Sequence, residues 1–168
     1  KEDKKARVDI SYLFAMRKSE QLPHLASPQA SNSSDRLFFV HGFKGHASIP
    51  IRGMHAFTAA LEGTWDGATK EALKDTHKAN PLAISFLMGH EFLLGRLILG
   101  NQIGYYLLDN RLTQESNSIN HIVYVRPGVQ IHLTDHIFVN VSAKISGRTS
   151  PLSPQIETWN FAIGGSFY

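Results

Sequence analysis

Residues 122–145 alternate almost without interruption between apolar and polar side chains, with a short break at Asp135 and His136. A period of two residues is the pattern of a β-strand, so the segment is predicted to form two strands joined by a tight turn. Successive side chains of a strand point to opposite faces. The fold of the whole chain then depends on which face meets solvent, and on whether that solvent is water or lipid.

The same period recurs along the rest of the chain and predicts about eight strands, most of them 10–14 residues long. The predicted strands cover residues 7–17, 36–45, 52–65, 82–91, 96–108, 121–134, 137–147 and 156–168. Strands of soluble proteins average about 5–6 residues, whereas a tilted strand needs about 9–11 residues to cross a membrane. The strand lengths therefore favour a membrane β-barrel.

The predicted connections are of two alternating kinds. Short connections near 46–51, 93–95 and 135–136 are separated by long polar ones at 18–34, 66–80, 109–120 and 148–155. Short periplasmic turns and long extracellular loops are typical of bacterial outer-membrane barrels. An even number of strands places both termini on the periplasmic side. We therefore predict an all-β fold, a single eight-stranded antiparallel transmembrane β-barrel domain over residues 1–168.

The distribution of charge indicates which face meets lipid. Across residues 96–108, 121–134, 137–147 and 156–168 the charged residues are Arg96, Arg126, Lys144 and Glu157. A water-facing sheet surface carries charge at roughly a quarter to a third of its positions, so these strands do not resemble one. The apolar face is predicted to meet lipid, and it includes Val123, Val125, Val129, Ile131, Val139, Val141, Phe161 and Ile163. The polar face then fills a narrow interior, where the charges must compensate one another, with Glu91 and Arg96 as the predicted pair.

Composition excludes several other classes of protein. The net charge of +3 is too small to indicate a nucleic-acid partner, and no cysteine is present for a disulfide or a thiolate metal site. No stretch approaches the run of about 18 apolar residues that a membrane helix needs. The nine histidines show no metal-ligand spacing, and no phosphate-binding loop is present, so neither a metal nor a cofactor is predicted. The chain begins with KEDKKARVDI, without an apolar signal segment, so it is either cytosolic or has lost a targeting peptide.

Several stretches resemble known outer-membrane proteins. The closing segment WNFAIGGSFY resembles the terminal strand that the outer-membrane assembly machinery recognises. The segments DGATKEAL, GHEFLLGRLILGNQIGYYLLD and HIFVNVSAKISG, together with that closing strand, resemble the small outer-membrane acyloxyacyl hydrolases or lipid A deacylases (PagL-like proteins) of Bacteroidetes. The resemblance covers roughly residues 52–168. It implies an eight-stranded barrel with lipid A as substrate, whose acyl ester is hydrolysed by a Ser–His pair and an orienting acid on the lipid-facing wall.

Only some of the catalytic residues that the resemblance implies are present in this chain. The His-x-Ser stretch falls on Lys144-Ile145-Ser146 and the acid falls on Glu157, so a lysine stands where the family has histidine. His121, near the top of the neighbouring predicted strand, is the candidate to replace it. By parity Ser146 faces inward and Glu157 outward, which separates them unless a bulge intervenes. Ser146, Glu157 and His121 are therefore the candidate catalytic residues, and His90 is interpreted as an interfacial histidine.

Two functional hypotheses remain. One is a structural or accessory barrel with degenerate deacylase ancestry, acting alone or as a subunit of a larger outer-membrane complex. The other is a working lipid A acyl-ester hydrolase. The lysine in the histidine position favours the first. Under either hypothesis the expected partners are membrane lipid and lipopolysaccharide, with other outer-membrane proteins as partners under the first.

Overall fold

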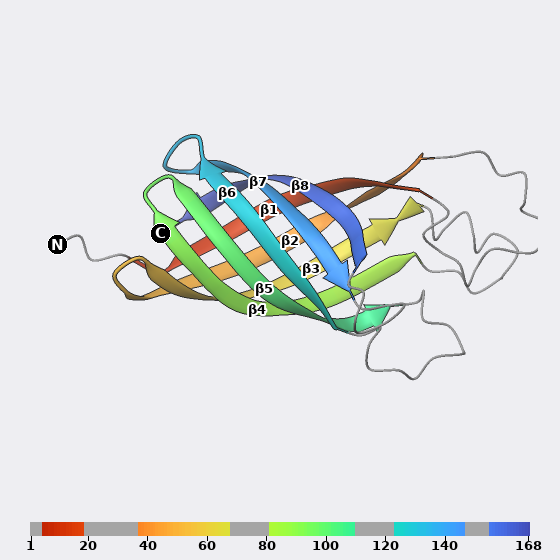
Figure 1. Ribbon diagram of the computed structural model, residues 1–168. Coiled ribbons are helices and arrows are strands. Elements are labelled where there is room, and N and C mark those ends of the chain that lie inside the picture. The colour runs from red at the N-terminus through yellow and green to blue at the C-terminus, as the bar shows by residue number, and fades with distance from the viewer. Residues whose placement is uncertain (1–4, 19–36, 68–80, 110–122, 147–154) are drawn as a thin grey trace, which may run out of the picture.

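The computed structural model describes residues 5–18, 37–67, 81–109, 123–146 and 155–168. These residues form β1 (Arg7–Lys18), β2 (Leu37–Arg52), β3 (His55–Asp66), β4 (Leu82–Leu94), β5 (Leu97–Asp109), β6 (Val123–His132), β7 (Ile137–Ser146) and β8 (Gln155–Phe167). Each strand pairs with the next, and β8 closes onto β1 from Val8↔Phe167 to Ala15↔Asn160. The sheet is thus a closed antiparallel barrel of eight strands, as predicted (Figure 1).

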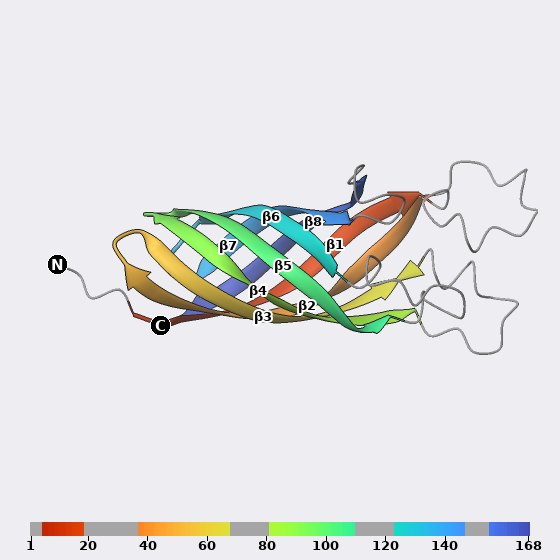
Figure 2. The same ribbon diagram turned by 60° about the horizontal axis from the view of Figure 1, so that its bottom comes forward.

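The strands are long and wind obliquely around the barrel (Figure 2). They range from 10 residues in β6 to 16 residues in β2. Closure leaves no edge strand with unpaired backbone groups. Among the described residues, no helix has the length and apolar character needed to cross a membrane.

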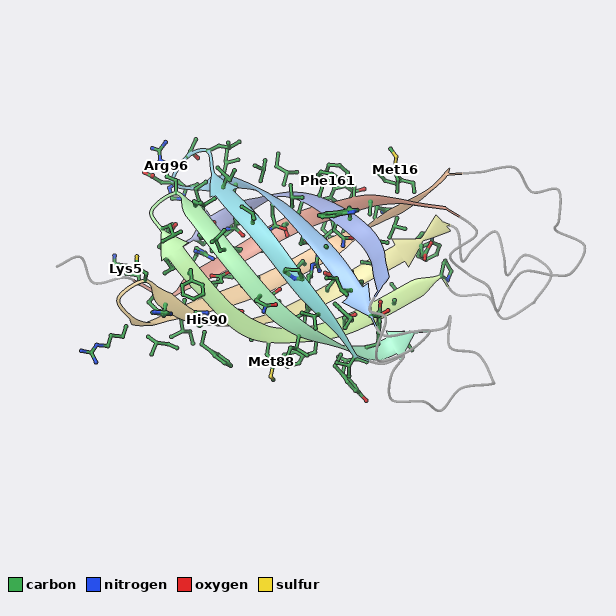
Figure 3. The ribbon with its side chains drawn as sticks, in the orientation of Figure 1. Lys5, Met16, Met88, His90, Arg96 and Phe161 are labelled. Atoms are coloured by element: carbon green, nitrogen blue, oxygen red, sulfur yellow. The ribbon has the colours of Figure 1, made fainter. Side chains whose placement is uncertain are left out.

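The two faces of the barrel wall follow the predicted parity. Of the eight residues predicted to meet lipid, seven are exposed on the outside and Val139 is half-buried. Met16, Met88 and Phe161 likewise point away from the barrel (Figure 3). The opposite parity, which includes Gln102, Arg126, Gln130, His132 and Lys144, is buried inside. The barrel is therefore apolar outside and polar inside.

The short turns lie at the end of the barrel where β1 begins and β8 ends (Figure 1). Gly53 and Gly95, in the turns after β2 and β4, have φ angles of 60° and 69°, which glycine adopts without a steric cost. The third turn follows β6 and is closed by a 2.9 Å bond from the Leu133 amide to the Ile137 carbonyl. The connections predicted near 93–95 and 135–136 are confirmed.

The short connection predicted near 46–51 is wrong, because β2 continues to Arg52. Within this stretch Ala47 pairs with Ala59, and Ile49 pairs with Phe57, so the alternation of faces carries on. Pro50 lies at an irregularity of the ladder between Pro50 and Arg52. A proline lacks the amide hydrogen that a regular ladder position needs, so such an irregularity accommodates it.

A second proline, Pro127, lies in the middle of β6. It pairs with Asn101 of β5 in regular register. On the other side, the pairing of β6 with β7 passes from Val125↔Ile145 to Gly128↔Ser142 with no pairs between them. The register is the same before and after this gap. Pro127 therefore interrupts the ladder without a bulge.

Candidate functional site

Ser146, the predicted nucleophile, is the last residue of β7 and faces the interior of the barrel. Only 5% of its surface is exposed. Its backbone pairs with Tyr124 of β6 on one side and with Gln155 of β8 on the other. The inward parity predicted for Ser146 is thus confirmed, and its hydroxyl lies on the side of the wall away from lipid.

Lys144, which occupies the family's histidine position, faces the interior as well and is 7% exposed. Its Nζ lies 4.0 Å from the centre of the Tyr124 ring and 4.3 Å from the centre of the Tyr106 ring. An ammonium group over the face of a tyrosine is attracted by the electrons of the ring. Lys144 is therefore held against two aromatic rings inside the barrel.

The structure describes Glu157 only in part and does not describe His121. Glu157 lies in β8, where Lys144↔Thr158 is followed by Ile145↔Ile156, so Glu157 is an extra residue at a bulge. A bulge breaks the alternation of faces, so the parity counted from Trp159 does not continue through this position. His121 lies outside the described residues, and for Glu157 the description is confined to the backbone. The grouping of Ser146, Glu157 and His121 into one catalytic site stays a prediction.

The middle of the barrel interior is filled by a network of polar side chains. Arg126 of β6 forms an ion pair with Glu62 of β3, and its Nε donates a 3.0 Å hydrogen bond to Ser142 Oγ. Lys44 Nζ donates to Gln102 Oε1 at 2.9 Å. Because buried charges are costly without partners, these contacts are what allows polar side chains to fill the barrel.

A second group of contacts lies nearer the short turns, where Arg7, Asp9, His46 and Glu91 form a four-residue ring. Arg7 contacts Asp9 and Glu91, each at 2.9 Å. His46 also contacts both carboxylates, each at 3.2 Å. The predicted pair of Glu91 with Arg96 is wrong, because Arg96 is exposed in the turn after β4. The ring joins β1, β2 and β4, and the order of these strands around the barrel brings its members together.

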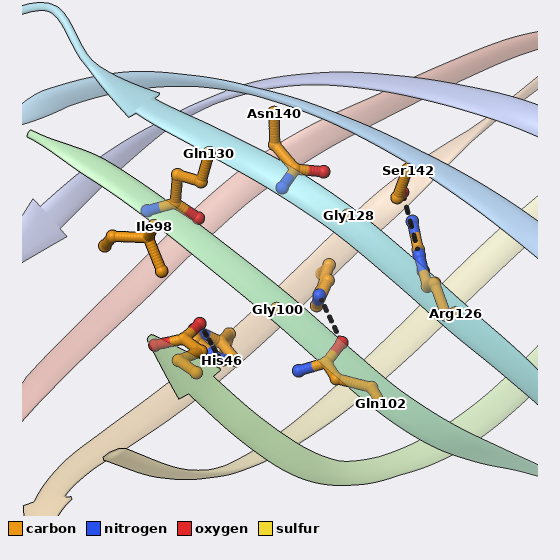
Figure 4. Close-up of a pocket in the computed structure, with 11 residues that line it drawn as sticks. His46, Ile98, Gly100, Gln102, Arg126, Gly128, Gln130, Asn140 and Ser142 are labelled. Carbon is orange, nitrogen blue, oxygen red and sulfur yellow. Dashed lines mark hydrogen bonds and ion pairs between the residues drawn. The ribbon is translucent and has the colours of Figure 1, made fainter. Parts of the chain in front are cut away.

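A small polar cavity lies between the two groups of contacts (Figure 4). Its volume is about 30 Å³ and its lining includes Lys44, His46, Glu91, Gln102 and Arg126. About 10–15 Å³ of such space is enough for one water molecule. The cavity thus has room for about two or three water molecules and none for an acyl chain.

The charges inside the barrel balance. Apart from histidine, the described ionisable side chains that face inward are four cations and four carboxylates. They are Arg7, Lys44, Arg126 and Lys144, and Asp9, Glu62, Asp66 and Glu91. Within the described residues, no three His, Cys, Asp or Glu side chains gather in a way that could hold a metal ion. Among the described residues, the cationic and anionic side chains inside the barrel are therefore equal in number.

The comparison with protein families agrees with this architecture. A family model for the C-terminal domain of acyloxyacyl hydrolases matches residues 7–151. The chain belongs to this family. The match includes Lys144 and Ser146 but ends before Glu157. It also covers all of β1 and β2, whereas the resemblance seen in the sequence covers roughly residues 52–168. The source in Bacteroidetes stays a prediction.

The comparison with solved structures shows the fold. A crystal structure of Ail, the attachment invasion locus protein of Yersinia pestis, matches with a TM-score of 0.50 and 12% identity, over 96% of this chain and 97% of that one. Ail in complex with the heparin analogue sucrose octasulfate gives 0.44 and 13%, over 96% and 97%. Ail in a phospholipid bilayer nanodisc gives 0.45 and 12%, over 97% and 100%. The search of curated proteins found no match. The chain thus has an outer-membrane β-barrel fold and an acyloxyacyl hydrolase domain.

Proposed function

We propose that this chain is a structural or accessory barrel of the outer membrane that descends from an acyloxyacyl hydrolase and does not hydrolyse lipid A. The observation that carries the proposal is the burial of Ser146 and Lys144 inside the barrel. A hydrolase of this family would act on an acyl chain that lies outside the wall. The serine hydroxyl must reach the ester carbonyl, and a base must lie within hydrogen-bond distance of that hydroxyl.

Two features of the interior support the proposal. On the same inward face of β7, two residues before Ser146, Lys144 lies against the rings of Tyr106 and Tyr124. The cavity further down the barrel has room for about two or three water molecules and none for an acyl chain. Two residues before the serine, where the family has its histidine, stands Lys144, whose Nζ lies over two aromatic rings.

The hydrolase remains the second candidate because of one observation. The bulge at Glu157 lies beside Ile145 and Ser146, which is where the family's acid would be needed. Bulges re-aim side chains and often accompany active sites. His121, from outside the described residues, would then have to supply the base.

In the membrane, the proposed role rests on the apolar outer wall. Its exposed valine, isoleucine, phenylalanine and leucine side chains fit contact with lipid acyl chains, and with lipopolysaccharide if the barrel opens toward the outer leaflet. We place both termini on the periplasmic side, together with the short turns. Other outer-membrane proteins are the partners that an accessory role would require.

The test is mass spectrometry of lipid A after incubation with the purified, refolded chain. Wild type, Ser146→Ala and Lys144→His are compared with a PagL-like enzyme that retains the His-x-Ser motif. The proposal expects identical lipid A acylation with all three forms of this chain. Loss of one acyl chain with wild type, and not with Ser146→Ala, would establish the hydrolase instead.

A further inference from the structure

Two histidines that are distant in sequence meet on the outer wall of the barrel. His55 begins β3 and His90 lies in β4, and His55 Nδ1 is 3.0 Å from His90 Nε2. His55 is exposed and His90 is half-buried. Figure 3 shows His90 toward the end of the barrel that carries the short turns. The pair could not be predicted from the sequence, because 35 residues separate its members.

The pair belongs to a polar patch on the outward faces of β3, β4 and β5. Asn101 of β5 is exposed and lies directly opposite His90 in the register of β4 and β5. Elsewhere on these three strands, the described outward residues are aliphatic, aromatic, methionine or glycine. They include Phe57, Leu61, Trp65, Met88, Phe92, Leu99, Ile103, Tyr105 and Leu107. The polar outward residues of β3, β4 and β5 are thus gathered at one place.

The surrounding ring of Phe92 orients the two imidazoles. Its centre is 4.9 Å from the His55 ring and 4.7 Å from the His90 ring, and it stands nearly edge-on to His90 at 79°. The two imidazoles are tilted by 44° to each other. Packing against an aromatic ring limits the rotation of each imidazole, so the two nitrogens are held close together before any ligand binds.

Two imidazole nitrogens at this distance share either a proton or a metal ion. Neutral imidazole carries one donor and one acceptor nitrogen, and it is the form that binds metals. A divalent ion binds imidazole nitrogen at about 2.0–2.1 Å. Two such bonds at angles of about 90–110° separate the nitrogens by about 2.9–3.4 Å. The observed separation of 3.0 Å therefore fits chelation of one ion after a small rotation of the rings.

We propose that His55 and His90 form a two-histidine site for a divalent transition-metal ion on the outer wall, beside the short turns. Copper(II) is the ion expected to bind most tightly, because imidazole sites generally prefer it to nickel and zinc. The remaining coordination positions face away from the barrel, where water or an anionic oxygen can occupy them. The site lies outside the barrel and is independent of whether Ser146 is catalytic.

The experiment titrates the full, refolded chain in detergent with Cu²⁺ and follows binding by calorimetry and by electron paramagnetic resonance. The variants are His55→Ala and His90→Ala. The matched control is His41→Ala, since His41 also lies on the outer wall and packs against the rings of Tyr12 and Phe39. Circular dichroism establishes that each variant keeps its β-structure.

The proposal expects one Cu²⁺ bound by wild type with hyperfine splitting from two nitrogens. Either alanine variant should bind it about tenfold more weakly or worse, which is the lower range for disrupting a metal site. His41→Ala should bind as wild type does. The proposal is overturned if wild type shows no saturable binding, or if both alanine variants bind Cu²⁺ as tightly as wild type, since the ion would then be held by other groups.

Discussion

Arg126 and Glu62 form an ion pair across the interior of the barrel, although their strands, β6 and β3, are not neighbours in the sheet. Both side chains are at least 96% buried. Arg126 also donates to Ser142 of β7, so one guanidinium links three strands. The barrel is therefore held together from inside as well as by its backbone ladder.

Removal of one partner of this pair should destabilise the barrel strongly. In Glu62→Gln the guanidinium of Arg126 stays buried without its counter-charge, and breaking a buried pair in this way costs about 3–5 kcal/mol. The double variant Glu62→Leu/Arg126→Met removes both charges and should recover most of the lost free energy of unfolding. The measurement is urea unfolding in lipid vesicles, followed by the fluorescence of Trp65 and Trp159.

The matched control for this ion pair is Arg96→Gln. Arg96 is exposed in a turn, so its loss should change the free energy of unfolding by less than about 0.5 kcal/mol. On this view the interior requires balanced charge and does not require this specific ion pair. The view is contradicted if Glu62→Leu/Arg126→Met is no more stable than Glu62→Gln.

The faces of the wall could be predicted from sequence, whereas the contacts inside could not. Whether Val141 or Phe161 points outward depends only on local alternation, which a sequence shows directly. The partner of Glu91 depends on how the strands are ordered and staggered around the closed barrel. Sequence analysis therefore chose the nearby Arg96, while in the structure Glu91 meets Arg7, 84 residues away.

Tyr124 lies over Gly104, its register partner on β5, and this contact sets the second prediction. A methyl group on Gly104 would overlap the Tyr124 ring, which is only 1% exposed and has little room to move. Gly104→Ala should therefore destabilise the barrel by about 1–3 kcal/mol, the usual cost of overpacking. The variant should also disturb the contact between Lys144 Nζ and the Tyr124 ring.

Gly45→Ala is the control for this prediction. A methyl group added to Gly45 has no atom within 4 Å, so the variant should unfold at nearly the same urea concentration as wild type. Urea unfolding of the two variants in vesicles compares them directly. Equal stabilities would show that the Tyr124 ring is not fixed in place.

Contact of the outer wall with lipid sets the third prediction. Val141, at the middle of β7, pairs with Val129 on one side and Phe161 on the other, and all three are exposed outward. Val141→Arg should lower the free energy of unfolding in vesicles by about 2–4 kcal/mol, as arginine does near the centre of a bilayer. Leu133→Arg, in the turn after β6, should cost about 0–1 kcal/mol. A barrel that faces water would tolerate both alike.

In the candidate site, only the facing of side chains that follows from the alternation of apolar and polar residues could be predicted. The inward parity of Ser146 follows from β7 itself and is confirmed. The bulge at Glu157 could not be predicted, because one extra residue leaves no separate mark in an alternating sequence. The approach of His55 to His90 was equally hidden, since it depends on the pairing of β3 with β4.

The central claim is that Ser146 faces the interior, out of reach of lipid, while its neighbour Ile145 faces the outer wall. The chain contains no cysteine, so single variants report one position each. The measurement is labelling of Ile145→Cys and Ser146→Cys in vesicles by an apolar maleimide dissolved in the lipid. The account predicts that Ile145→Cys reacts and that Ser146→Cys does not. Labelling of Ser146→Cys at the rate of Ile145→Cys would contradict this claim. It would mean that Ser146 faces the lipid, where an acyl chain lies.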